Sequence, residues 1–140
     1  MEIIINTFKV KYVLFMFTFL LLGLNTYQLQ AQVKSSKISF IETKHDFGKV
    51  QQGRVLTYIF KFQNNGEDSL EIKNVRASCG CTGAAIGEKK KFANGEEGEI
   101  KVTFDTNGRT GVQNKTVSVQ TNDPENLNVM LSFTCEIVSK

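Results

Sequence analysis

The sequence predicts an all-β protein, specifically an antiparallel β-sandwich of about seven short strands. Several segments alternate apolar and polar residues with a period of two, which is the pattern of a strand that buries one face. Turn-forming clusters such as Asn64-Asn65-Gly66 and Asn122-Asp123-Pro124 separate these segments. Length alone also permits a small barrel, but the spacing of strands and turns favours the sandwich.

The N-terminal segment predicts an export signal. Lys9 and Lys11 precede an uncharged apolar run from Tyr12 to Leu24, whose thirteen residues fit the core of a signal peptide. A membrane-spanning helix needs about 20 apolar residues, although an uncleaved membrane anchor is the alternative. We expect cleavage after Ala31, so that residues 1–31 are the signal peptide and 32–140 the folded domain. The domain would then be periplasmic, secreted or at the cell surface, with no stable membrane span.

The charge of the domain is nearly balanced. Without Glu2, Lys9 and Lys11, fifteen basic and thirteen acidic side chains remain, which gives a net charge of +2. Nucleic-acid-binding domains usually show a basic stripe, so we expect no nucleic-acid partner. The run from Lys89 to Lys91 is interpreted as a solvated loop.

The first half of the domain contains three predicted strands. They are 37–42, 54–63 and 69–76, with a turn expected near Gly48 between the first two. In the second strand one face carries Leu56, Tyr58, Phe60 and Phe62. In the third, Leu70 and Ile72 point inward but Val75 is out of phase, which indicates a bulge.

The second half begins with a segment from Thr82 to Gly95 that is interpreted as an irregular connection, with room for one short strand. Strands are then predicted at 99–105, 111–121 and in the last segment of the chain. The inward face of the last strand is expected to carry alternate residues: Leu127, Val129, Leu131, Phe133, Cys135 and Ile137. This order of strands and turns favours an immunoglobulin-like topology.

Cys79 and Cys81 are the main candidate site. In an extended strand, residues two apart lie roughly 6.7 Å apart between Cα atoms, near the upper limit for a disulfide. Closing a bond between them needs a bend, which Gly80 is expected to allow. Such a bond would be strained and therefore more easily reduced than a structural disulfide.

Three roles are open for the Cys79–Cys81 pair. It is a reducible local disulfide, a thiolate pair that binds a soft metal such as Cu(I), or a structural pair that pins the turn. Cys135 is interpreted as a buried, inert thiol in the core, although a bond from it to either cysteine is an alternative. His45, beside Asp46, is expected to be a surface residue. We find no catalytic set of residues, and we predict no cofactor.

The motifs together resemble the DUF1573 family. The resemblance covers about residues 40–138 and rests on Asp46-Phe47-Gly48, Phe60-Lys61-Phe62-Gln63-Asn64-Asn65-Gly66, Ser78-Cys79-Gly80-Cys81-Thr82, Gly95-Glu96-Glu97-Gly98, Phe104-Asp105, Gly111 and Thr121-Asn122. It implies an exported bacterial protein with an immunoglobulin-like fold. It implies no activity, because the family is a domain of unknown function.

These observations favour a non-enzymatic binding or scaffolding module of the bacterial envelope, with a protein or other envelope component as partner. Domains of this kind commonly bind partners through a strand edge or end loops. The alternative is a thiol-based function at Cys79 and Cys81, either Cu(I) binding or disulfide exchange.

Overall fold

The computed structural model describes Lys11 and residues 34–139. The predicted signal peptide, apart from Lys11, and the cleavage site at Ala31 lie outside the described residues. Within Lys11 and 34–139, no helix has the length and apolar character needed to cross a membrane.

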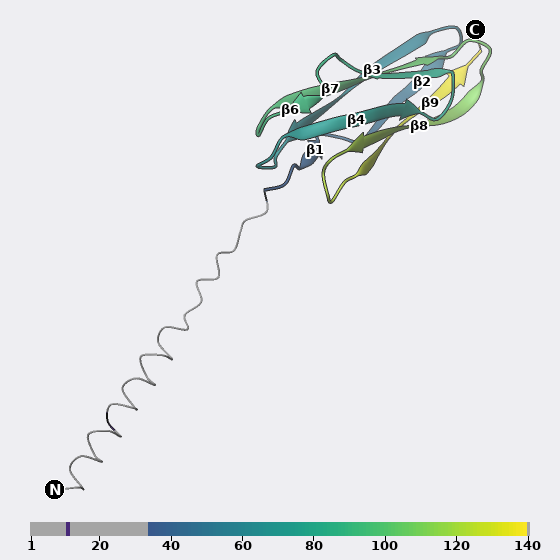
Figure 1. Ribbon diagram of the computed structural model, residues 1–140. Coiled ribbons are helices and arrows are strands. Elements are labelled where there is room, and N and C mark those ends of the chain that lie inside the picture. Colours follow the sequence, from purple (N-terminus) through teal and green to yellow (C-terminus); the bar gives the residue numbers. More distant parts are fainter. Residues whose placement is uncertain (1–10, 12–33, 140) are drawn as a thin grey trace, which may run out of the picture. The chain divides into compact units, whose positions relative to one another are not determined.

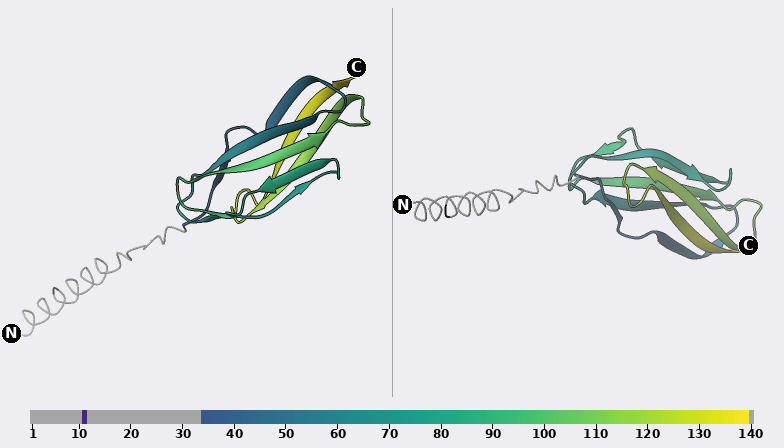
Figure 2. Two further views of the ribbon diagram at one scale, coloured as in Figure 1. Left: turned by 90° about the horizontal axis from the view of Figure 1, so that it is seen from above. Right: turned by 60° about the horizontal axis from the view of Figure 1, so that its bottom comes forward.

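Residues 34–139 form two β-sheets packed face to face (Figures 1 and 2). The first sheet contains, in spatial order, β1 (Ile38–Phe40), β3 (Val55–Asn64), β7 (Glu97–Asp105) and β5 (Thr82–Ile86). The second contains β2 (Lys44–Gln51), β9 (Asn128–Val138), β8 (Gly111–Thr121), β4 (Leu70–Ala77) and β6 (Lys91–Phe92). The predicted all-β sandwich is confirmed.

The core lies between the sheets and consists of the residues that the alternation places inward. In β3, Phe60 and Phe62 are almost fully buried, while Val55 and Ile59 on the opposite face are exposed. The same alternation buries parts of β4, β7, β8 and β9. The buried hydrophobic residues of these strands are Leu70, Ile72, Ile100, Val102, Phe104, Val117, Val119, Leu131, Phe133, Cys135 and Ile137.

Three strands were not expected in full. β2 continues through Gly48, where a turn was predicted, because this glycine adopts a φ of 65° inside the strand and causes a bulge against β9. β5 occupies part of the segment predicted to be irregular, and β6 adds two residues. The described part of the chain therefore has nine strands rather than about seven.

Two further expectations about the sheets were wrong. β2 runs parallel to β9, whereas all other strand pairs are antiparallel. Leu127 is 59% exposed and precedes β9, because the loop before it is closed by a hydrogen bond from the Thr121 amide to the Leu127 carbonyl. The bulge predicted in β4 is confirmed between Ile72 and Asn74.

Buried polar side chains hold the loops at one end of the sandwich. Asn64 is fully buried; its amide nitrogen donates to the carbonyls of Asp68 and Phe92, and its oxygen accepts from the amides of Lys37 and Gly66. This residue was predicted only as part of a turn. Its four hydrogen bonds satisfy backbone groups of three separate segments, so it ties those segments together.

Candidate functional site

The Cys79–Gly80–Cys81 turn connects the two sheets, because β4 before it and β5 after it belong to different ones. The Ser78 amide donates to the carbonyl of Thr116 in β8 over 3.0 Å. The carbonyl of Cys81 accepts from the amide of Asp105 in β7 over 3.2 Å. One short turn is thus attached by backbone hydrogen bonds to both layers of the sandwich.

Cys79 and Cys81 form a disulfide in this structure, with their Cα atoms 5.3 Å apart. The bend comes from a β-turn in which the Thr82 amide donates to the Cys79 carbonyl over 3.2 Å. Gly80 does not have a positive φ, and a Cβ built on it meets nothing within 4 Å. Glycine, which was expected to allow the bend, is therefore not required at position 80, since an L-residue also fits there.

Cys79 and Cys81 are half-buried, and the hydroxyl of Thr82 lies near both sulfurs. It lies 3.4 Å from Cys79 Sγ and 3.9 Å from Cys81 Sγ. A disulfide sulfur carries no hydrogen, so the hydroxyl donates. Within Lys11 and residues 34–139, no group of three or more His, Cys, Asp or Glu side chains forms a metal site. Cu(I) binding would need the pair to be reduced first, because a disulfide offers no thiolate.

Cys135 is a free cysteine on the inward face of β9 and only 2% exposed. Burial raises the pKa of its thiol, as does the charge of Asp46, while Lys115 acts in the opposite direction. The bond from Cys135 to Cys79 or Cys81, which was the alternative, is not formed. A buried thiol with a raised pKa is a poor nucleophile, in agreement with the predicted inert role.

His45 is half-buried rather than a surface residue. Its ring stacks on Tyr58 with centroids 3.5 Å apart and meets the edge of Phe47 at 4.6 Å. The carboxylate of the neighbouring Asp46 accepts a hydrogen bond from the Gly48 amide. This hydrogen bond is the main cause of the lowered pKa of Asp46. Both residues therefore shape the bulged strand β2.

The feature that the sequence did not predict is the open edge formed by β5. Among the described strands, β5 ends the first sheet and pairs with β7 alone. Its sequence, Thr-Gly-Ala-Ala-Ile, contains no charged residue and no proline, which are two of the devices that protect an edge strand.

The backbone register shows which groups of β5 face outward. The Asp105 amide donates to the Cys81 carbonyl, and opposing residues in an antiparallel ladder alternate between bonded and non-bonded pairs. Gly83 and Ala85 therefore direct their backbone groups toward β7. The amide and carbonyl groups of Ala84 and Ile86 point away from the sheet, to the open edge.

The other sheet edges are protected. In β1, the outward amide of Ile38 donates to the buried carboxylate of Asp123 over 2.9 Å. β2 is charged and bulged at Gly48, and β6 has only two residues. The part of β4 that does not pair with β6 begins at the bulge between Ile72 and Asn74 and carries the charged residue Arg76. Among the described strands, β5 is the edge best suited to pair with another strand.

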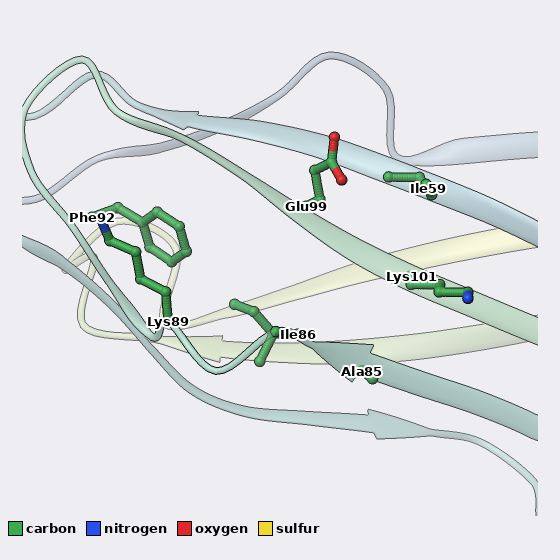
Figure 3. Close-up of a pocket in the computed structure, with 8 residues that line it drawn as sticks. Ile59, Ala85, Ile86, Lys89, Phe92, Glu99 and Lys101 are labelled. Atoms are coloured by element: carbon green, nitrogen blue, oxygen red, sulfur yellow. The ribbon is translucent and has the colours of Figure 1, made fainter.

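A hollow of about 390 Å³ lies beside β5 (Figure 3). Its lining includes the apolar residues Ile59, Ala85, Ile86 and Phe92 and the charged residues Lys89, Glu99 and Lys101. Lys89 forms an ion pair with Glu96, and Glu99 lies 3.7 Å from Lys61. Lys101 has no carboxylate partner among the described residues. The hollow and the open backbone edge therefore form one continuous surface.

Comparison with solved structures shows the fold. A protein of unknown function from Porphyromonas gingivalis superposes with a TM-score of 0.65 at 15% identity, over 79% of this chain and 51% of that protein. The Vibrio cholerae VesB protease gives 0.62 at 13% identity, over 71% of this chain and 31% of the protease. The chain thus spans about half of the Porphyromonas gingivalis protein and about a third of the protease.

A PapD-like domain of human CEP192 matches with a TM-score of 0.59 at 8% identity, over 76% of this chain and 88% of that domain. These identities support a shared fold and no more. A comparison with curated proteins finds no match. The family model described as "Protein of unknown function (DUF1573)" matches residues 38–137, which is most of the chain. The chain therefore belongs to the DUF1573 family.

Proposed function

We propose that this protein is an exported, non-enzymatic binding or scaffolding module of the bacterial envelope, and that it holds its partner through the edge of β5. The observation that carries the proposal is the orientation of the Ala84 and Ile86 backbone groups, which are left to the open edge. An extended segment of another protein can pair with such groups and continue the sheet.

The structural use of the polar residues supports a non-enzymatic role. Asn64 and Asp123 are buried and form hydrogen bonds with backbone groups of neighbouring loops. Thr106, also buried, bonds in the same way to both the amide and the carbonyl of Arg54. These side chains stabilise the ends of the sandwich and are not arranged around the hollow.

The test is site-specific photo-crosslinking in cells. A benzoyl-phenylalanine at Ala85, which is exposed on β5, is expected to give a discrete adduct with a partner protein. The matched control is the same probe at Gln120, exposed on β8 in the other sheet. The adduct at position 85 is expected to disappear with Ala84→Pro, because proline lacks the outward amide. Equal adducts at positions 85 and 120, or none at 85, would contradict the proposal.

A thiol-based function at Cys79 and Cys81 is the second candidate. It is favoured by the half-exposed position of the disulfide in a surface turn, where a partner thiolate can attack either sulfur. That attack forms a mixed disulfide and releases the other cysteine as a thiolate. Intact mass with and without reductant, together with bound-metal analysis, separates the candidates. An oxidised pair that resists mild reductant and carries no copper excludes the thiol function.

A further inference from the structure

The open edge of β5 lies beside basic side chains. Lys101 is exposed on β7 directly opposite Ala85, and Lys89 to Lys91 follow β5 in the chain. Lys89 is paired with Glu96, but Lys101 and Lys90 have no carboxylate partner among the described residues. An incoming strand therefore meets positive charge that acidic side chains would complement.

The register fixes where the side chains of an added strand would lie. Residues opposite Gly83 and Ala85 would point to the outer face of the sheet, on the same side as Lys101. Two strand spacings separate the added strand from β7, which is about 10 Å. Because Ala85 is small, a glutamate of the added strand and Lys101 can reach each other across it.

The alternate residues of an added strand would face the other way. They would lie opposite Ala84 and Ile86, which are half-buried and pack against the core. Ile86 also lines the hollow with Phe92, whose ring belongs to the core. An apolar side chain at these positions would extend the core at its edge, while a charged one would lose hydration without a partner.

We propose that the partner of this surface is an extended protein segment in which acidic and apolar residues alternate. The segment adds to β5, places its acidic side chains beside Lys101 and packs its apolar side chains on Ile86 and Phe92. This inference rests on the proposed function and specifies its ligand. Two β5 edges from separate copies fit less well, because each brings the same lysines to the interface.

The test measures binding of two capped heptapeptides to the purified protein by fluorescence anisotropy. The first is Glu-Val-Glu-Val-Glu-Val-Glu, and the second replaces every glutamate by lysine. We expect the acidic peptide to bind at least tenfold more tightly than the basic one, and the preference to shrink as salt rises. A peptide of the same composition with its glutamates and valines in separate blocks is expected to bind at least tenfold more weakly than the alternating one.

Variants locate the binding. Lys101→Glu is expected to weaken binding of the acidic peptide roughly three- to tenfold, the range for one exposed ion pair exchanged for a repulsion. Lys101→Met serves as a neutral variant with an intermediate effect. Lys44→Glu makes the same charge change on β2, at an edge of the other sheet, and is expected to leave binding unchanged.

The outcomes separate this inference from the proposed function. Equal binding of the acidic and basic peptides, or equal losses for Lys101→Glu and Lys44→Glu, overturns the acidic partner. In that case a crosslink at Ala85 that depends on the Ala84 amide still supports the edge as a binding surface. Loss of both the crosslink and peptide binding overturns both.

Discussion

Replacing Cys79 and Cys81 together by serine is expected to lower the free energy of unfolding by about 1.6 kcal/mol. The disulfide joins residues two apart, so it closes a loop of only three residues. For a loop of that size the chain-entropy relation gives about 5.4 cal/mol/K, which is about 1.6 kcal/mol at 25 °C. The hydrogen bonds from Thr82 to Cys79 and from Asp105 to Cys81 remain available in the variant.

The loss is measured by urea denaturation and by thermal unfolding, where it corresponds to a fall in Tm of roughly 6–12 °C. Wild-type protein in the presence of reductant is the control and should match the double variant. A loss above about 4 kcal/mol would refute the entropic explanation, since the bond would then hold native contacts together. Identical stability of variant and wild type would show that the bond does not constrain the chain.

Three other predictions concern buried polar groups. Asn64→Ala is expected to lower the free energy of unfolding by about 3–4 kcal/mol in urea denaturation, because four backbone groups, two in buried and two in part-buried hydrogen bonds, lose their partner at about 1 kcal/mol each. A loss below about 1 kcal/mol would contradict this. Burial acts to raise the pKa of Asp123, but hydrogen bonds from Ile38, Glu125 and Asn126 outweigh it and lower the pKa in the folded state. The resulting stabilisation is present above the pKa of Asp123 in the unfolded chain, about 3.9, and is lost as pH falls through its lower pKa in the folded protein. Asp123→Asn should therefore flatten the pH dependence of the free energy of unfolding below about pH 4. Cys135 should resist iodoacetamide in the native protein and take one label after denaturation, as measured by intact mass; rapid native labelling would show that the thiol is accessible.

Strands with strong alternation could be predicted from the sequence because burial imposes that pattern. The buried face of β3, and that of β9 from Leu131 onward, follow directly from it. The same pattern cannot locate where a strand starts, and Leu127 was therefore placed inward although it belongs to the preceding loop. β2 was missed for a related reason, since a glycine that usually marks a turn here forms a bulge inside a strand.

The candidate site was predictable only in part. The Cys79–Cys81 pair stands out in the sequence, but the two sheets that its turn connects follow from strand order, which alternation does not encode. β5 consists of small residues with little polar contrast, so it carries no periodic signal. Its position at an edge depends on the pairing of β3, β7 and β1, which only the tertiary structure shows.

The open edge of β5 is tested most directly by amide hydrogen exchange, resolved by residue and measured with and without the acidic peptide. In the free protein, Gly83 and Ala85 should be protected by their bonds to β7, whereas Ala84 and Ile86 should exchange quickly. Addition of the peptide should protect Ala84 and Ile86 and leave Ile38 at the opposite edge unchanged. Equal protection of the amides of Gly83, Ala84, Ala85 and Ile86 in the free protein, or no change on addition of the peptide, would contradict a binding edge at β5.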